Sequence, residues 1–191
     1  MKLLVGLGNP GREHMLDRHN LGFIAVESWV LLKGEEFRKK EFHAEVARVK
    51  FGVEDVVVLK PLTYMNRSGE AIQEAMQFFK VSIDDVIVVH DEIDIPPKSF
   101  RLKRGGGHGG HNGLRSIITL GESFVRIRMG VGRPLHPGMD VADYVLGKLS
   151  KEELDFWQEN MRDVEDAIDL SLAGQWEKAA TKYNRKSGSE N

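Results

Sequence analysis

The chain has 191 residues, of which 41% are hydrophobic and 29% charged, and this length and composition predict one globular domain spanning residues 1–191. The absence of cysteine excludes disulfides, thiolate catalysis and zinc sites with thiolate ligands. A formal net charge of −2 argues against a protein that coats nucleic acid indiscriminately, and no stretch approaches the roughly 18 apolar residues of a membrane span.

The first predicted element is a short buried strand over residues 2–7, followed by the turn Gly8-Asn9-Pro10-Gly11. Its apolar run is too brief for a signal peptide, so we expect a cytoplasmic protein. The turn presents Asn9 at the carboxyl end of a strand, where ligands bind in open α/β sheets. A nucleotide site is the alternative, but the glycine spacing fits neither G-x-G-x-x-G leading into a helix nor a P-loop.

A helix with apolar residues is predicted next over residues 21–32, and Arg18-His19-Asn20 stands at its start. A single histidine is more often structural than catalytic. His19 therefore becomes a candidate general base only if a second polar group accompanies it.

Two predicted strands follow, over residues 41–51 and 56–59, and a turn at Gly52 allows them to pair antiparallel. The next segment, residues 60–69, leads from a strand into a helix expected over residues 71–79.

In that segment Ser68 is predicted to be the N-cap of the helix, which leaves Met65 and Asn66 without a structural role. An asparagine amide both donates and accepts hydrogen bonds and is neutral at every working pH. Asn66 is thus suited to hold an ester carbonyl or an attacking water.

The most apolar strand is predicted over residues 86–90 and ends in His90-Asp91-Glu92. Asp91 thereby comes to the carboxyl end of a strand, as Asn9 does. A carboxylate that accepts a hydrogen bond from one imidazole nitrogen leaves the other nitrogen able to take a proton from water. His19 and Asp91 are candidates for such a pair.

Basic side chains gather over residues 98–104, and a glycine-rich segment follows over residues 105–114. Six glycines leave backbone N–H groups bare and give flexibility, which predicts a mobile substrate loop. The two histidines of this loop, His108 and His111, together with His90, Glu92 and Asp94, allow a metal site as an alternative. We expect no metal, because metal motifs have tighter signatures.

The last predicted elements are a strand over residues 124–130 and a long helix over residues 150–172, whose outer face is acidic. Residues 187–191 are expected to fray. The alternation of strands and helices predicts an α/β fold with a mixed, mostly parallel twisted sheet flanked by helices. Separate basic and acidic zones indicate a polyanion-binding face, although ordinary solvated charge is the simpler interpretation of any one cluster.

Five linked segments resemble the bacterial peptidyl-tRNA hydrolase family, and the similarity covers nearly the whole chain, as far as Tyr144-Val145-Leu146-Gly147-Lys148. Each segment alone is a weak signal, but their order and spacing together are specific. They are Gly6-Leu7-Gly8-Asn9-Pro10-Gly11, Arg18-His19-Asn20-Leu21-Gly22, residues 60–69, His90-Asp91-Glu92 and residues 105–114.

The resemblance implies a monomer without cofactor or obligate protein partner, which hydrolyses peptidyl-tRNA that has left the ribosome and frees peptide and tRNA. It implies His19 as the general base, Asp91 as its orienting partner, and no covalent intermediate. The remaining implied residues fall into two groups. The cleft group contains Asn9, His14, Tyr64, Met65, Asn66, His111 and Asn112, and the group that would meet tRNA phosphates contains Arg101, Lys103, Arg104 and Arg133.

Two positions depart from the family pattern, because His14 stands where many members have tyrosine and Asp17 where they have threonine. With His14 in place of tyrosine, the contact that this tyrosine makes at the edge of the cleft is not expected in the same form. Asp17 either caps the helical segment that starts at Arg18, which we favour, or stabilises the imidazolium of His19.

Two other functions are compatible with parts of the sequence. One is an RNA-binding module without catalysis, which should lack His19 or Asp91, yet both are present. The other is an esterase or amidase of small molecules. The basic strip over residues 98–104 argues against it, because a small neutral ester needs no such surface.

Overall fold

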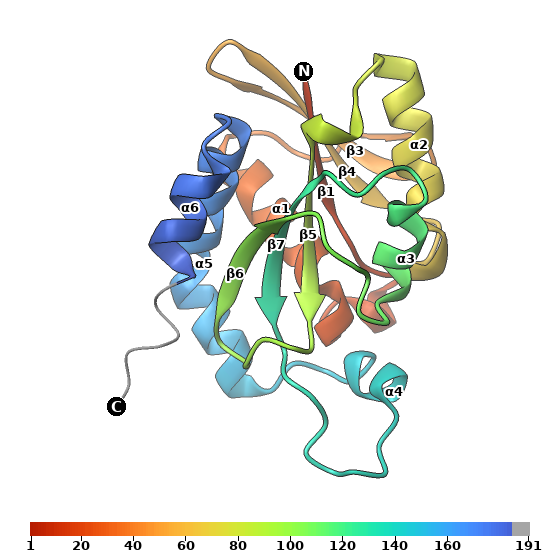
Figure 1. Cartoon of the computed structure of the whole chain (residues 1–191), viewed down its shortest axis with the longest axis vertical. Coiled ribbons are helices and arrows are strands. Elements are labelled where there is room, and N and C mark those ends of the chain that lie inside the picture. The colour runs from red at the N-terminus through yellow and green to blue at the C-terminus, as the bar shows by residue number, and fades with distance from the viewer. Residues whose placement is uncertain (185–191) are drawn as a thin grey trace.

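The computed structural model describes residues 1–184 and is built on a seven-stranded sheet with the order β2-β3-β4-β1-β5-β7-β6 (Figure 1). β1 pairs parallel with β4 and β5, and β5 pairs parallel with β7, whereas the β2–β3, β3–β4 and β6–β7 pairs are antiparallel. The strands are β1 Lys2–Gly6, β2 Lys39–Glu41, β3 Ala44–Phe51, β4 Glu54–Pro61, β5 Val86–Glu92, β6 Phe100–Arg104 and β7 Val125–Gly130.

Helices cover both faces of this sheet. α1, α5 and α6 lie on one side, and α2 and α3 lie on the other (Figure 1). A short helix, α4, stands beyond the carboxyl ends of the strands. The helices are α1 Leu21–Leu32, α2 Ser68–Phe79, α3 Asn112–Ile118, α4 Val141–Val145, α5 Lys151–Leu172 and α6 Trp176–Tyr183.

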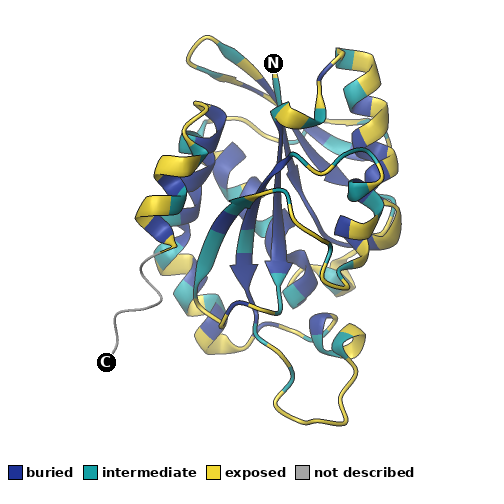
Figure 2. Cartoon of the chain, viewed as in Figure 1, coloured by how far each residue is buried: buried dark blue, intermediate teal, exposed yellow. Residues whose placement is uncertain are grey.

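Each face of the sheet has its own hydrophobic core, because successive strand residues point to opposite sides. The core on the α1, α5 and α6 side contains Trp29 and Trp157 and reaches β6 and β7 through Leu102 and Ile127. The core on the α2 and α3 side ends earlier and leaves the outer part of that face, over β7 and β6, to charged residues. Figure 2 shows the central strands buried and the segment before α4 exposed.

The predicted fold class is confirmed, and several element bounds agree closely with the sequence interpretation. α1 spans the predicted residues, and β3 and β4 form the expected antiparallel pair around Gly52, whose φ is 61°. The strand expected over residues 41–51 is interrupted, however. Phe42 and His43 have φ values of 55° and 53° and make a turn, so Glu41 belongs to β2.

Two expectations about helix starts were wrong. Ser68 is the first residue of α2 and not its N-cap, and its hydroxyl donates to the Met65 carbonyl at 2.8 Å. Asp17 does precede a short helical turn, Arg18–Asn20, but its side chain does not cap it. Its carboxylate instead binds two side chains outside that turn, described below.

Several elements went unrecognised in the sequence, among them β6, α4 and α6. β6 does alternate apolar Phe100 and Leu102 with basic Arg101 and Lys103, but the sequence interpretation used this segment only as a basic strip. It pairs with β7 along its length. The predicted fraying of residues 187–191 lies outside the described residues. Within residues 1–184, no helix is long and apolar enough to cross a membrane.

Candidate active site

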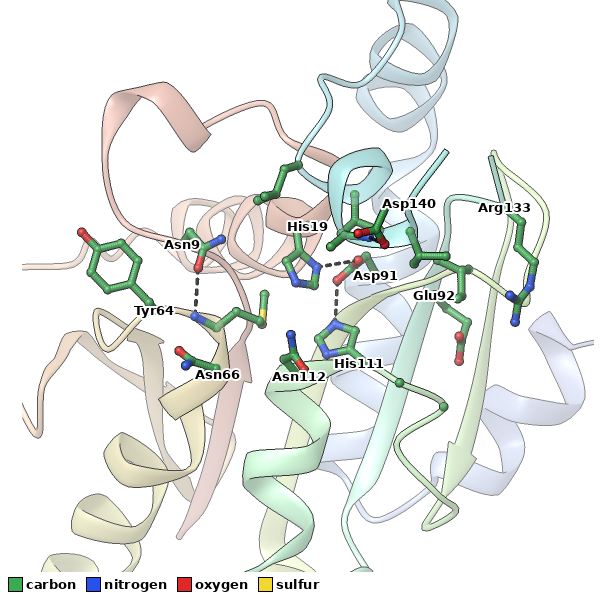
Figure 3. Close-up of a pocket in the computed structure, with 18 residues that line it drawn as sticks. Asn9, His19, Tyr64, Asn66, Asp91, Glu92, His111, Asn112, Arg133 and Asp140 are labelled. Carbon is green, nitrogen blue, oxygen red and sulfur yellow. Dashed lines mark hydrogen bonds and ion pairs between the residues drawn. The ribbon is translucent and has the colours of Figure 1, made fainter. Parts of the chain in front are cut away.

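A cleft of about 520 Å³ opens at the carboxyl ends of β1, β4 and β5. Figure 3 shows Tyr64 and Asn9 at one side of it, His19 and Asp91 in the middle, and Arg133 at the other side. Ligands of open α/β sheets bind at this edge. The lining residues are Asn9, His19, Tyr64, Met65, Asn66, Asp91, Glu92, Ile93, Gly109, Gly110, His111, Asn112, Arg133, Asp140, Val141, Ala142, Val145 and Leu146.

The centre of the cleft holds a carboxylate between two imidazoles. Asp91 Oδ2 lies 2.7 Å from His19 Nδ1, and Asp91 Oδ1 lies 2.8 Å from His111 Nε2 (Figure 3). An ionised carboxylate only accepts hydrogen bonds, so both ring nitrogens that face it carry a proton. Neutral His19 is therefore protonated on Nδ1, and its Nε2 keeps a lone pair.

The protonation of His111 follows independently from its other nitrogen. Nδ1 of His111 accepts hydrogen bonds from the backbone N–H groups of Gly113 and Leu114, at 3.1 and 3.3 Å, and so caps α3. The proton of the neutral ring must then be on Nε2, the nitrogen that faces Asp91. His111 thus donates to Asp91 without bringing a charge.

The carboxylate of Asp91 is ionised and the imidazolium of His19 is stabilised by it. Burial opposes the charge of Asp91, but the charge of protonated His19 and the hydrogen bonds from His19 and His111 outweigh it, so the pKa of Asp91 lies well below its usual range. Burial likewise favours neutral His19, but the charge and hydrogen bond of Asp91, with a contribution from the charge of Asp17, raise the pKa of His19 above 6.5. A base with its pKa near the working pH is the effective one.

His19, Asp91 and His111 are close enough to suggest a metal site, because one ligand atom from each lies within 4.8 Å of the others. The hydrogen bonds do not fit that role. A metal-binding histidine donates its second N–H to a carbonyl or carboxylate, whereas the second nitrogen of His111 accepts from backbone N–H groups.

His90, another histidine of the metal alternative, is fully buried and has both ring nitrogens occupied. Its Nδ1 donates to the Asp91 carbonyl at 2.7 Å, and its Nε2 accepts from Arg126 Nε at 3.2 Å. Burial, and then the charge of Arg126, lower the pKa of His90 well below its ordinary value and keep the ring neutral. His90 therefore holds the backbone of Asp91 and does not line the cleft.

Asn9 has a fixed orientation in the cleft wall. Its Oδ1 accepts the backbone N–H of Met65 at 2.8 Å, so its Nδ2 is left as a donor toward the cleft (Figure 3). The backbone of Asn9 is held by the side chain of Asn20, which accepts from the Asn9 N–H and donates to its carbonyl, both at 2.9 Å. Asn20 was present in the predicted motif without a role, and its position beside His19 was the available signal.

The other predicted cleft residues come from the start of α3 and from the short 3-10 turn η3, Met65–Arg67, with the residue before it. Met65 is buried, while Tyr64, Asn66 and Asn112 are exposed at the cleft wall. Oδ1 of Asn112 accepts from Arg115 Nη1 at 3.1 Å, which turns its amide nitrogen outward as a donor. Asn9, Asn66 and Asn112 therefore bring amide groups to the same cleft as His19.

His14 does not line the cleft. Its Nδ1 lies 2.6 Å from Asp17 Oδ2, and the other oxygen of Asp17 binds the Lys148 ammonium. This carboxylate is as buried as Asp91, with the residue 0% exposed. The structure thus assigns His14 and Asp17 to a contact between the loop before α1 and the segment after α4.

The predicted tRNA-contacting residues separate into three places. Arg101 and Lys103 of β6 stand opposite Arg128 and Arg126 of β7 and share with them the face of the sheet that the helices leave uncovered. Arg104 points to the opposite face, where its guanidinium lies 5.8 Å from the Trp176 ring. Arg133 lines the cleft and is paired with Asp94 at 2.7 Å.

One residue of the shared face is buried, Arg126. The face consists of Arg101, Lys103, Arg126 and Arg128. Arg126 binds the carbonyls of Gly105 and Gly107 and thereby attaches the glycine-rich loop to β7. Burial, and repulsion from Arg128, lower the pKa of Arg126 to about 10. Burial and the same two arginines lower the pKa of Lys103, which marks a crowded positive surface.

The sequence interpretation missed one wall of the cleft. This wall consists of the apolar residues Val141, Ala142 and Val145 of α4 and Leu146, with the carboxylate of Asp140 at the start of the helix. A five-residue helix has too few turns to produce a periodic signal, and only the similarity over residues 144–148 marked this region.

Comparison with known proteins places the chain in a family. The family model described as peptidyl-tRNA hydrolase matches residues 3–191. A peptidyl-tRNA hydrolase of Anaeromyxobacter dehalogenans is 47% identical over 193 residues and covers 98% of both chains, and one of Bdellovibrio bacteriovorus is 45% identical over 96% of this chain and 100% of its own. The crystal structure of peptidyl-tRNA hydrolase from Acinetobacter baumannii superposes with a TM-score of 0.87 at 38% identity, covering 95% of this chain and 93% of that one. The chain belongs to the peptidyl-tRNA hydrolase family.

Proposed function

We propose that the chain hydrolyses the ester between peptide and tRNA with a water molecule that His19 activates, without a covalent intermediate. The observation that carries this mechanism is the 2.7 Å bond between His19 Nδ1 and Asp91, which leaves the basic Nε2 in a cleft lined by amide donors. Membership of the family supports the reaction itself.

The reaction begins with a water between His19 Nε2 and the ester carbonyl carbon. As its oxygen attacks, its proton moves to Nε2, and Asp91 stabilises the resulting imidazolium. The tetrahedral oxyanion accepts hydrogen bonds from amide groups, and Asn9 Nδ2 is the best fixed of them because its Oδ1 is bound to Met65. Collapse breaks the ester bond, and the ribose oxygen takes the proton from Nε2.

His111 keeps Asp91 in place during this cycle. Its neutral N–H holds one carboxylate oxygen while the other serves His19, so Asp91 neither rotates nor gains a proton. A second positive charge at this position would compete with the imidazolium, and the backbone bonds at His111 Nδ1 disfavour it.

The tRNA extends from the ester toward the basic face of β6 and β7, where Arg101, Lys103 and Arg128 are half-buried. We propose phosphate contacts with Lys103, Arg101 and Arg128, which share that face, because cations gathered on one surface bind a polyanion. Arg128 is also paired with Glu92 at 3.0 Å, so a phosphate would share it with that carboxylate. Arg104 and Arg133 are weaker candidates because they stand apart from this face, one on the opposite side of the sheet and the other at the cleft.

The test is release of labelled peptide from an N-acetyl-aminoacyl-tRNA in the presence of EDTA, with His19→Ala beside the wild type. We expect rapid release by the wild type and loss of about 10³-fold or more in kcat for the variant, with tRNA binding retained. Wild-type binding without release would replace this proposal by an RNA-binding module. Near wild-type rates for His19→Ala would show that another group is the base.

We also propose that the protein acts as a monomer and in the cytoplasm. The proposed reaction needs His19, Asp91 and the cleft asparagines, which a single chain brings together, so it does not require a second copy. The tRNA substrate supports the second statement. Size-exclusion chromatography with light scattering tests the oligomeric state, and a mass of two chains at assay concentrations would contradict it.

A further inference from the structure

A second cavity of about 330 Å³ adjoins the cleft on the far side of Asn9. Asn9 lines both cavities, and Asn20, which holds the Asn9 backbone, lines the second. Ligand pockets in proteins have volumes of roughly 300–1,000 Å³, so this cavity is large enough for part of a ligand. The mechanism described above makes no use of it.

The position of this cavity follows from the order of the strands. The basic face lies on β6 and β7, at one end of the sheet, and His19 and Asp91 lie near β1 and β5. The second cavity lies toward the other end, beside β4 and β3, which supply Lys60 and Glu45. In Figure 3 Asn9 and Tyr64 likewise stand across His19 from Arg133.

The positions of the basic face, His19 and the second cavity along the sheet determine how the substrate is oriented. The ester must lie at His19 and the tRNA must leave toward the basic face, so the peptide leaves on the opposite side, past Asn9. The second cavity begins at that point. The peptide residues just N-terminal to the ester-linked residue are therefore the ones that enter this cavity.

The lining indicates which side chains the cavity accepts. Phe23 and Ile24 of α1, Met15 of the preceding loop and Leu62 after β4 give it an apolar surface. The ammonium group of Lys60, 9% exposed as a residue, is held 2.6 Å from Glu27 and 2.7 Å from Glu45. These three charges are paired with one another, and the one other charged residue of the lining, Arg12, is exposed.

We propose that this cavity is a subsite for an apolar side chain of the peptide, N-terminal to the residue joined to tRNA. The inference rests on the proposed function and deepens it, since it makes the enzyme sensitive to peptide residues beyond the ester. Apolar contacts of this kind are worth roughly tenfold or more in kcat/KM.

The experiment uses three substrates on one tRNA with the same ester-linked residue: acetyl-alanyl-tRNA, acetyl-glycyl-glycyl-alanyl-tRNA and acetyl-leucyl-leucyl-alanyl-tRNA. For the wild type, we expect kcat/KM of the leucyl substrate to exceed that of the glycyl one by about tenfold. The variants Leu62→Trp and Met15→Trp each fill the cavity and should bring this ratio close to one. Two variants are used so that poor folding of one leaves the other as the test, and melting curves monitor folding.

Leu31→Trp is the matched control, because Leu31 is a leucine of α1 that is 76% exposed and lines neither cavity. It should keep the wild-type ratio. A wild-type ratio near one overturns the proposal, as does a ratio that both filling variants leave unchanged. Equal slowing of the leucyl and glycyl substrates would assign the cavity to the tRNA end instead. Failure of the proposed function has a different signature, since the wild type would then release no peptide even from acetyl-alanyl-tRNA.

Discussion

Two histidine–aspartate pairs of nearly equal geometry lie in different parts of this molecule. His19 Nδ1 is 2.7 Å from Asp91, and His14 Nδ1 is 2.6 Å from Asp17. Both carboxylates are buried, with 1% of Asp91 and 0% of Asp17 exposed. The pairs differ in the second partner of each aspartate and in what the second imidazole nitrogen faces.

Asp91 has a neutral second partner, His111, so its charge is shared only with His19 when that ring is protonated. The other nitrogen of His19 faces a cleft that can hold a water. Asp17 instead binds the ammonium of Lys148, whose side chain is 57% exposed, and His14 lines no part of that cleft. The first pair can exchange protons with a substrate, while the second neutralises a cation.

The second pair connects two segments that flank the cleft. The Arg18 N–H donates to the Gly147 carbonyl at 3.0 Å, and the Leu149 N–H donates to the Leu16 carbonyl at 2.9 Å. Asp17 and Lys148 lie between these two bonds. These contacts attach the wall formed by α4 to the loop that carries His19. A histidine–aspartate pair can therefore hold two segments together or act as a base, depending on its surroundings.

The largest expected difference between the pairs is in turnover. Asp91→Asn should lower kcat by about 10³–10⁴-fold, because an amide neither stabilises the imidazolium nor fixes its tautomer. Asp17→Asn should lower kcat by less than about tenfold, since Asp17 has no contact with the reacting nitrogen. Single-turnover peptide release measures both, and melting curves verify that the variants are folded.

Comparable losses in the two variants would contradict this ranking. They would mean that Asp17 acts on the reaction through the loop it anchors. Separate values for kcat and KM identify that case, because displacement of the α4 wall should also weaken substrate binding.

A smaller difference is expected in the pH dependence. His19 acts as a base only when neutral, so its raised pKa shifts the rise of kcat/KM to a pH above 6.5. Asp17 contributes to that raised pKa through its charge, after Asp91. Asp17→Asn removes this charge, lowers the pKa of His19 and moves the rise to lower pH.

Glu35→Gln is the control for charge, because it removes an exposed carboxylate just beyond the far end of α1. It should leave the pH profile in place, since a solvated charge at that distance is screened. An Asp17→Asn profile that coincides with those of wild type and Glu35→Gln would limit Asp17 to anchoring the loop.

The sequence predicted the pair that lies in the cleft better than the one that lies outside it. His19 and Asp91 were matched because strand ends converge at one edge of an α/β sheet, and the same argument brought in Asn9. His14 and Asp17 were assigned separate roles. Lys148, the second partner of Asp17, is 131 residues away in the chain and belongs to no periodic segment.

Other misses have the same physical origin, since they depend on long-range placement. The bond of His111 to Asp91 requires α3 to begin at Asn112, and the glycine-rich loop before it has no periodicity that predicts this start. Arg104 was grouped with Lys103 and Arg101 by sequence proximity. Only pairing of β6 with β7 determines that alternate residues face opposite sides of the sheet.

The smallest expected effect concerns stability. Lys148→Met removes the ammonium from Asp17 and keeps the length of the side chain, so the buried carboxylate is left with His14 alone. Because Lys148 is more than half exposed, we expect the free energy of unfolding to fall by only about 1 kcal/mol and kcat to stay within about twofold of wild type. Urea titration followed by circular dichroism measures the first quantity. A loss of several kcal/mol would mean that this anchor, and not the sheet core beneath it, limits the stability of the cleft.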